Sequence, residues 1–422
     1  MMKINQLKII RDSFFVIIFS NLSNVASLLY QIFMGRNISS SDYGLLISFY
    51  SVLGILSLPS VIIPFIVNNF LSEKDNQYEK DYFLANIFYL CGFILIVEII
   101  FIILFKDAFF SLLKFYSFRY LTLLLTLQCL TFLLAILMGI YTSKSMYIHF
   151  SIIGPSSLYF RLILLLICIY FFSKVNVDII LQINILAVFL SIIIAIYFAK
   201  TKLFKLFFKK YEFENGILKI TKFAAPTFFI FLAIIFLQNI DAIIVRKILS
   251  KSESGLISST IVLGKIPLFL FSALIYVIFP EIKKNINKIK DFFSIKKFLF
   301  FLLIVIFIST SYSIFVYSFG DEIIDLIFKK SFKNVNFIFA IISLYYFQVS
   351  LFLMLTSCFL TDITIGLFYA YILIFLVITG FCAYSFLYLI SAETLFISLN
   401  LMVFAVNIIA LFYAFRFFTH KK

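Results

Sequence analysis

The sequence contains no tryptophan, and both charged residues and glycines are scarce. Only 13% of its 422 residues are charged, whereas 64% are hydrophobic, a balance far outside that of soluble domains. The five cysteines lie inside apolar runs without CxxC spacing, so the pattern predicts neither disulfides nor a metal site. Without tryptophan, an aromatic belt at a bilayer interface has to consist of Tyr and Phe. The composition therefore excludes a soluble domain and indicates an integral membrane protein.

Motifs of common catalytic sites are also missing. Gly264-Lys265 is not a phosphate-binding loop, because the preceding spacing and the following Ile266 do not fit the motif. His149 and His420 lie near the ends of apolar runs and outside any HExxH context. No connection is long enough to form an extramembrane catalytic domain. We therefore expect neither catalytic residues nor a metal or cofactor, and no ATP-driven pump.

Apolar runs long enough to cross a bilayer predict an all-α fold with twelve transmembrane helices. Each half of the chain is expected to form a six-helix bundle, with a basic cytoplasmic linker at 200–219 between bundles at 1–199 and 220–422. Lys and Arg are about twice as frequent in the segments that would be inside if both termini were cytoplasmic, which predicts that orientation. The net charge of +15 is spread over short loops and indicates attraction to anionic lipid rather than to nucleic acid. The predicted spans are 13–35, 44–70, 82–105, 118–141, 146–172, 178–199, 220–245, 254–280, 297–318, 334–358, 364–389 and 392–416.

An internal repeat relates the two halves. With an offset of about 211 residues, Asp42 matches Glu253, Gly44 matches Gly255 and Arg36 is close to the position of Arg246. The serines before Asp42 predict an N-cap for the following helix, and Gly44 allows two backbones to approach closely. The repeat predicts two parallel copies of one membrane unit.

Charged residues inside the predicted spans mark the candidate site, because each costs about 2.5–3.5 kcal/mol near the centre of a bilayer. Arg161 and Lys265 are the candidates for a cationic cavity that binds an anionic group. Asp241 and Glu98 are candidates for coupling to protons or sodium ions, or for pairing with a cation and holding helices together. Arg36 and Arg246 lie near the predicted outer interface of the membrane. They would either help to bind the anion or extend their guanidinium groups to the interface.

Uncharged polar residues follow helical spacing in several spans. Ser20, Asn24, Ser27 and Gln31 recur at i, i+4, i+7 and i+11 and share one helix face, while Gln238 shares a face with Asp241. Such stripes either line an aqueous path or hydrogen-bond to neighbouring helices. We interpret Asn24, Gln31 and Gln238 as the polar lining of the cavity. Asn400 and Asn407 form a similar pair near the C-terminus.

Two stretches resemble a known family of membrane proteins. MGRNISSSDYGLLISFYSVLGILSLPSVIIPFIVNNF (34–70) and NIDAIIVRKILSKSESGLISSTIVLGKIPLFLFSALIYVIFPEI (239–282) are similar to the polysaccharide-biosynthesis, or O-antigen, flippases of the Wzx type. This family belongs to the multidrug/oligosaccharidyl-lipid/polysaccharide (MOP) exporter superfamily. Together the stretches cover about a fifth of the chain.

The resemblance implies a two-bundle, V-shaped fold in the bacterial inner membrane. The resemblance implies that the substrate is an undecaprenyl-pyrophosphate-linked oligosaccharide repeat, which alternating access moves from the inner to the outer leaflet. It also implies a cationic cavity that binds this substrate, and Arg161 and Lys265 would be the cations of that cavity. Implied partners are the lipid bilayer and the polymerase and chain-length proteins of the same pathway. Two alternatives stay open: a cation-coupled drug or metabolite antiporter of the same superfamily, and a membrane glycan polymerase, which the short outer loops disfavour.

Overall fold

The structure is a computed structural model that describes residues 2–72, 77–115, 117–144, 146–171, 175–199, 216–271, 292–329, 335–359, 380–381 and 391–420. All regular secondary structure within these ranges is helical, as predicted. The helices are α1 (Met2–Asn37), α2 (Ser40–Leu56), α3 (Leu58–Ser72), α4 (Gln77–Leu104), α5 (Lys106–Leu113), α6 (Phe118–Ser143), α7 (Tyr147–Phe171), α8 (Val177–Ala199), α10 (Gly216–Ile248), α11 (Lys251–Gly264), α13 (Phe292–Phe328), α14 (Asn336–Phe359) and α16 (Ala392–His420).

Many of these helices have the length and composition of membrane spans. In the described ranges, eight are long and apolar enough to cross a bilayer, and a ninth is added if α2 and α3 count as one span bent by 47°. The protein therefore has a multi-pass membrane fold. The predicted span 364–389 lies almost wholly outside the described residues, so the count of twelve stays a prediction, as does the cytoplasmic location of both termini.

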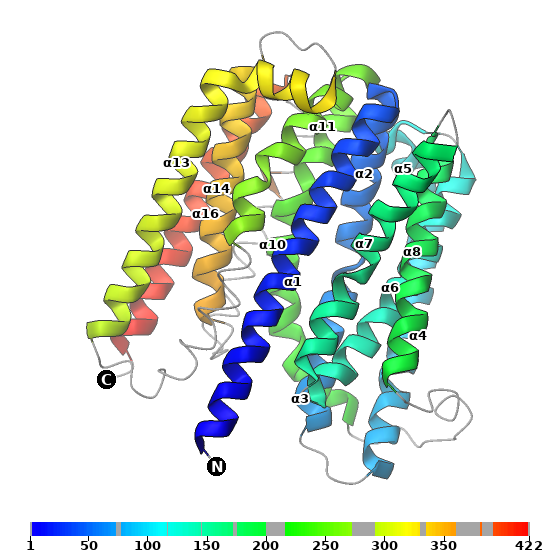
Figure 1. Ribbon diagram of the computed structural model, residues 1–422, viewed down its shortest axis with the longest axis vertical. Coiled ribbons are helices and arrows are strands. Elements are labelled where there is room, and N and C mark those ends of the chain that lie inside the picture. The colour runs from blue at the N-terminus through cyan, green and yellow to red at the C-terminus, as the bar shows by residue number, and fades with distance from the viewer. Residues whose placement is uncertain are drawn as a thin grey trace. The chain divides into compact units, whose positions relative to one another are not determined.

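The chain forms two compact units. The first consists of Met1–Tyr30 and Val52–Phe231, and the second of Gln31–Ser51 and Leu232–Lys422, so α1, α2 and α10 each contribute to both units. Within the first unit, α6 packs against α3 and α8, and α7 packs against α8. Within the second, α14 packs between α13 and α16, and Figure 1 shows these three helices running side by side. The predicted bundle limits at 199 and 220 stay a prediction, and most of the linker lies outside the described residues.

Corresponding residues of the two repeats have the same local structure. Asp42 donates its backbone N–H to the hydroxyl of Ser39 (3.1 Å) at the start of α2. Glu253 does the same to Ser250 (3.3 Å) at the start of α11, where the Glu253 side chain also accepts the Ser250 N–H. Both caps satisfy backbone donors that have no partner within the helix. The N-cap predicted before Asp42 is therefore confirmed, and the spacing of 211 residues recurs in the structure.

A second correspondence lies further along each unit. Lys114 ends α5 with a φ of 54°, and Lys329 follows α13 with a φ of 53°. These are the only described residues other than glycine with a positive φ, a conformation that costs an L-residue about 1–2 kcal/mol. The same unusual helix end in both halves supports a structural repeat beyond the matched sequence motifs.

The break between α2 and α3 lies at Ser57, two residues before Pro59. The backbone N–H of Ser60 bonds to Ser57 O at 2.9 Å, so the carbonyl of Leu56 loses its usual partner in the helix. Gln128 of α6 supplies a replacement, because its Nε2 donates to Leu56 O at 2.7 Å. A side chain of a neighbouring helix thus stabilises this break.

The end of α11 is arranged in a similar way. Pro267 has no N–H to donate to Leu263 O, four residues earlier. The hydroxyl of Tyr312 in α13 donates to this carbonyl instead, at 2.9 Å. Lys265 lies at the interruption, two residues before the proline, which corresponds to the position of Ser57 in the first unit. Pro59 and Pro267 therefore coincide with helix interruptions in the two repeats.

Candidate functional site

The candidate site of the second unit contains three side chains from three helical segments. Asp241 lies in the C-terminal part of α10, Tyr346 lies in α14, and Lys265 caps the C-terminus of α11. The Tyr346 hydroxyl donates a hydrogen bond to Oδ2 of Asp241. Lys265 places its Nζ over the Tyr346 ring, 5.3 Å from the centroid, within the range of a cation–π interaction. The structure thus brings Asp241 and Lys265 to the same tyrosine.

Burial makes this cluster electrostatically important. Asp241 is fully buried, and it interacts electrostatically with Lys265. An isolated buried carboxylate would be very costly, and Tyr346 supplies this one with a hydrogen bond. Lys265 itself is only partly buried. The hydroxyl of the adjacent Tyr345 donates to the carbonyl of Leu237, one turn before Asp241, and thereby fixes α14 against α10.

Arg161 provides the other candidate cation and lies in the first unit. It is part of α7, whose residues Ile148–Phe171 form one of the candidate spans. Its Nε is buried and has no hydrogen-bond partner among the described residues. Two residues earlier, the Tyr159 hydroxyl donates to Phe19 O in α1 at 3.0 Å, so this part of α7 packs against α1. A buried guanidinium nitrogen without a described acceptor is costly inside a span.

Glu98 belongs to α4 and lies beside α6. Its side chain is partly buried and interacts with Gln128, the residue that donates to Leu56 O at the α2–α3 break. One of its carboxylate oxygens, Oε2, is buried without a described hydrogen-bond partner. Glu98 is therefore connected through Gln128 to the helix break, an arrangement that the sequence alone did not indicate.

Arg36 and Arg246 both bind backbone carbonyl groups. Arg36 donates from Nε to Ile327 O and from Nη2 to Leu326 O at 2.8 Å, at the C-terminal end of α13, where a positive charge is favourable to the helix dipole. Arg246 is 2% exposed. Their predicted part in binding a substrate stays a prediction, but in this structure their guanidinium groups hold helix ends together.

Arg246 is the more enclosed of the two arginines. Its Nη1 lies 3.2 Å from both Ser41 O and Lys251 O, and 2.9 Å from the hydroxyl of Ser254. The carboxylate of Asp42 also acts on it electrostatically. One guanidinium thus connects the start of α2 with the start of α11, the two segments that the repeat relates.

The predicted polar lining is partly exposed at each of its positions. Asn24, Gln31 and Gln238 all have intermediate exposure, and Asn24 belongs to the first unit whereas Gln31 belongs to the second. Within the first unit, the buried Asn184 of α8 donates from Nδ2 to the Tyr30 hydroxyl at 3.0 Å. Their role in lining a path stays a prediction.

Asn400 and Asn407 join helices, which was one of the two interpretations of such stripes. Asn400 Nδ2 donates to Ile341 O at 3.0 Å, and its Oδ1 accepts from Nε2 of Gln348 at 3.1 Å. Asn407 donates to Gln348 O at 2.9 Å. These bonds connect α16 to α14 and leave this pair with a structural role.

No pattern in the sequence pointed to Tyr346 or Gln128 as candidate site residues. Both lie in strongly apolar runs, and only the rarity of polar groups there could have singled them out. Tyrosine is common in this chain, with 24 copies, so its presence at one position carries little information. Their importance comes from partners more than 70 residues away along the chain.

The chain matches no known protein family by sequence and no functionally characterised protein. Solved structures are nevertheless similar over nearly its whole length. A multidrug resistance MATE family transporter of the MOP superfamily, in an inward-facing conformation, superposes with a TM-score of 0.69 at 12% identity, covering 94% of each chain. The lipid II flippase MurJ, in an inward closed conformation, gives 0.68 at 16% identity, covering 95% of this chain and 88% of MurJ.

A third similar structure is a MOP superfamily transporter from Pyrococcus furiosus, described by a reverse polarity of its binding pocket that suggests a different function. It gives a TM-score of 0.62 at 13% identity, covering 98% of this chain and 96% of that one. The protein therefore has the fold that a multidrug resistance transporter of the MOP superfamily shares with a lipid II flippase.

Proposed function

We propose that this protein is a flippase for undecaprenyl-pyrophosphate-linked oligosaccharide repeat units of O-antigen or capsule. It would move them from the cytoplasmic to the periplasmic leaflet of the bacterial inner membrane by alternating access. The observation that carries the proposal is the position of Arg161 within an apolar span, with a buried Nε that no described residue accepts from.

The charge of Arg161 argues for a substrate that brings an anion into the membrane. A guanidinium remains protonated at any physiological pH and matches the geometry of phosphate oxygens. The free-energy cost of this charge inside a bilayer falls when the guanidinium has an anionic partner or contacts water. A diphosphate linked to a lipid supplies that partner, because the head group enters the protein while the polyprenyl tail stays in hydrocarbon. A cationic drug would instead be repelled.

Lys265 is the second cation of the proposal, and it is partly exposed beside Tyr346. Since Arg36 and Arg246 are occupied by backbone carbonyls, the proposal assigns the head group to Arg161 and Lys265. Glu98 and Asp241 remain the candidate groups for coupling transport to protons or sodium ions. The bilayer and the polymerase and chain-length proteins of the same pathway would be its partners, and nucleic acid would not.

The first experiment compares the surface glycan of a strain lacking this gene with that of the parent, separated by size. We expect no surface glycan and an accumulation of single lipid-linked repeats in the inner leaflet. Single repeats that reach the surface without polymerisation would instead indicate a polymerase. An unchanged glycan ladder, together with new sensitivity to cationic dyes, would replace the proposal with the antiporter.

Complementation with variants then tests the site. Arg161→Ala and Lys265→Ala should each reduce surface glycan strongly while the protein remains in the membrane, and Arg161→Lys should retain part of the activity. Arg119→Ala is the matched control, because Arg119 is exposed and pairs with Asp178 at 3.0 Å. Normal export by the Arg161→Ala and Lys265→Ala variants would refute the assignment of the head group to these residues.

A further inference from the structure

Each unit contains a short helical segment that begins at a bend in the chain. In the first unit the bend is at Phe105, which has a φ of −102° and a ψ of 19°, and α5 follows it. In the second unit the bend is at Phe319, which has a φ of −130° and a ψ of 21°, and the last part of α13 follows it. We call residues 101–114 the first elbow and residues 315–329 the second elbow.

The ends of the two elbows are also alike. Lys114 ends the first elbow and Lys329 ends the second, and both have a positive φ. The residue before each lysine is buried, Leu113 in the first unit and Phe328 in the second. The bend, the helical segment and the lysine therefore recur in the same order in both repeats.

A pair of exposed aromatic rings lies at the bend of each elbow. The ring centroids of Phe101 and Phe105 are 4.7 Å apart at an interplanar angle of 44°. Those of Phe315 and Phe319 are 5.5 Å apart at 45°. Each of these four side chains is between 46% and 52% exposed. The same tilted pair of rings therefore lies on the surface of both units.

The first elbow has two exposed sides of different chemistry. Asp107 and Ser111 are four residues apart on α5 and both are exposed, so they share one side of this helix. Phe105 and Phe109 share another side, and the Phe109 ring lies 6.3 Å from that of Phe101 in α4. The apolar side of α5 thus continues the exposed rings of α4, whereas the polar side carries a carboxylate and a hydroxyl group.

The second elbow repeats this division. Glu322 and Asp325 are three residues apart and both are exposed, whereas Ile324 and Phe328 on the other side of the segment are buried. An exposed carboxylate is costly in hydrocarbon. The part of α13 that follows Phe319 therefore fits a position outside the hydrocarbon core, although α13 continues to Phe328.

We propose that both elbows are interfacial anchors, which hold the bend of each unit at the boundary between the hydrocarbon and the head groups of the surrounding phospholipids. The exposed phenylalanines contact the acyl chains next to their head groups, and the carboxylates and lysines lie among the head groups and water. Tryptophan and tyrosine usually occupy this depth. Because the chain contains no tryptophan, the phenylalanine pairs take that place here.

The lengths of the preceding spans agree with this boundary. The span Phe83–Leu104 has 22 residues, which at about 1.5 Å per residue extend over about 33 Å, close to the hydrocarbon thickness of about 30 Å. It ends one residue before Phe105. The span predicted at 297–318 ends one residue before Phe319. Both bends therefore lie where an apolar run of bilayer length ends, and the predicted topology places both on the outer side.

Arg36 provides a further indication of depth in the second unit. Its Nη2 donates to Leu326 O of the second elbow at 2.8 Å, and the sequence predicts Arg36 near the outer interface. An arginine at a helix end favours the level of the head groups, where its guanidinium contacts water and phosphate. The second elbow and this arginine therefore fit the same level of the membrane.

Tryptophan fluorescence can locate the elbows, because a tryptophan introduced into this chain is its only one. Phe105→Trp and Phe319→Trp are purified as full chains and reconstituted into vesicles of phosphatidylethanolamine and phosphatidylglycerol. The acyl chains carry bromine either near the carboxyl end or near the methyl end, and iodide quenches from the water. We expect both variants to lose most emission to bromine near the carboxyl end.

Matched variants provide the depth scale. Phe93 and Phe307 lie near the midpoints of the two preceding spans and are 64% and 71% exposed, so Phe93→Trp and Phe307→Trp should lose most emission to bromine near the methyl end. Ser111→Trp and Glu322→Trp replace residues on the polar sides of the elbows. These two should be quenched by iodide more strongly than the variants at the bends are.

Three outcomes would overturn the proposal. Bend variants with the quenching profile of the midpoint variants would place the elbows inside the hydrocarbon. Quenching by iodide alone would place them in water, and a carboxyl-end maximum in only one unit would contradict a repeated anchor. If a tryptophan at a bend lowers the melting temperature strongly, Phe101→Trp and Phe315→Trp report the same boundary from the other ring of each pair.

Discussion

Gly44 of α2 and Gly255 of α11, equivalent residues of the two repeats, lie against each other in the second unit. A Cβ added to Gly44 would be 2.8 Å from the backbone nitrogen of Gly255, and a Cβ on Gly255 would overlap the carbonyl oxygen of Ser40. The helix N-termini that the repeat relates thus cross at their glycines. Arg246 reinforces this crossing by binding Ser41 O and Lys251 O.

The crossing should not tolerate a methyl group on Gly255. Overpacking a well-packed site typically costs about 1–3 kcal/mol, and here the obstacle is backbone, which cannot turn aside as a side chain can. We expect Gly255→Ala to lower the melting temperature of the purified protein and its amount in the membrane. Gly92→Ala is the control, because nothing lies within 4 Å of a Cβ at Gly92. Equal melting temperatures for the two variants would contradict the close crossing.

Arg246 should contribute mainly to stability. Arg246→Ala leaves Ser41 O and Lys251 O without this donor, and a buried polar group that loses its partner costs about 1–3 kcal/mol. Thermal melting in detergent should therefore show a clear loss, only partly restored by Arg246→Lys. Lys251→Ala retains the backbone carbonyl and removes an exposed side chain, so it should melt as the wild type does. A variant with normal stability but no transport would instead return Arg246 to the substrate site.

The Asn400 side chain should hold α16 to α14. Asn400→Leu removes its bonds to Ile341 O and Gln348, and hydrogen bonds between membrane helices contribute about 0.6 kcal/mol each on average. We expect a modest decrease in melting temperature without a change in substrate selectivity. Leu401→Ala, on the exposed side of α16, provides the comparison. A change in selectivity with unaltered melting would favour the aqueous path instead.

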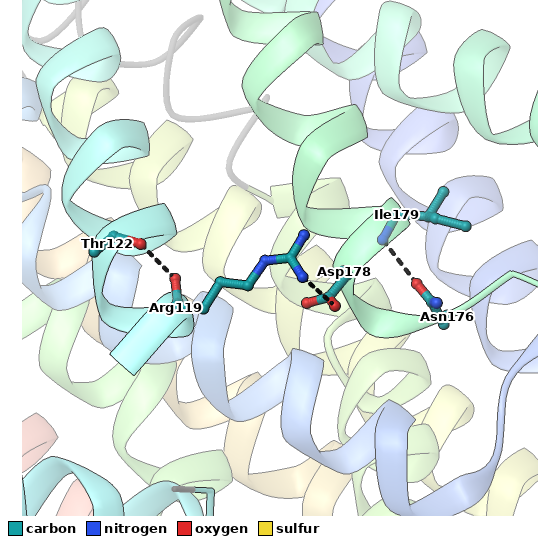
Figure 2. A network of polar contacts seen from close by, with 5 residues as sticks. All are labelled: Arg119, Thr122, Asn176, Asp178 and Ile179. Carbon is teal, nitrogen blue, oxygen red and sulfur yellow. Dashed lines mark hydrogen bonds and ion pairs between the residues drawn. The ribbon is translucent and has the colours of Figure 1, made fainter. Parts of the chain in front are cut away.

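The ion pair between Arg119 and Asp178 should have little effect on either property. It joins the N-terminal turns of α6 and α8 (Figure 2) at 3.0 Å, with 54% and 31% of the two side chains exposed. Exposed pairs of this kind contribute about 0.2–1 kcal/mol. Arg119→Ala should therefore shift the melting temperature only slightly and leave export normal, and the shift should shrink in high salt. Loss of export would reveal a function that its exposed position does not indicate.

Asn176 and Thr122 complete the local structure around that ion pair. Asn176 Oδ1 accepts the backbone N–H of Ile179 at 2.9 Å, and the Thr122 hydroxyl donates to Arg119 O at 2.7 Å (Figure 2). These bonds cap or extend the first turns of α8 and α6. Sequence patterns alone readily indicate such local features, because both partners lie within four residues of each other.

The sequence by itself determined the membrane character, the helical class, the repeat and the cap before α2. Each follows from local composition or from spacing along one helix: apolar runs match the bilayer thickness, and a serine hydroxyl reaches an N–H three residues later. The intramembrane charges were also visible, because a charge in an apolar run is costly wherever the fold places it.

Only the tertiary structure decided which of these polar groups meet. Tyr346 reaches Asp241 across 105 positions of the chain, and Gln128 reaches Leu56 across 72. It also showed Arg36 and Arg246 on backbone carbonyls and left Arg161 with a buried nitrogen that no described residue accepts from. Helical spacing places a residue on a face of its own helix, but the partner of that face depends on packing between helices. The sequence therefore shows which charged residues lie in apolar spans, where a charge has a high free-energy cost, whereas packing between helices determines which groups each of them contacts.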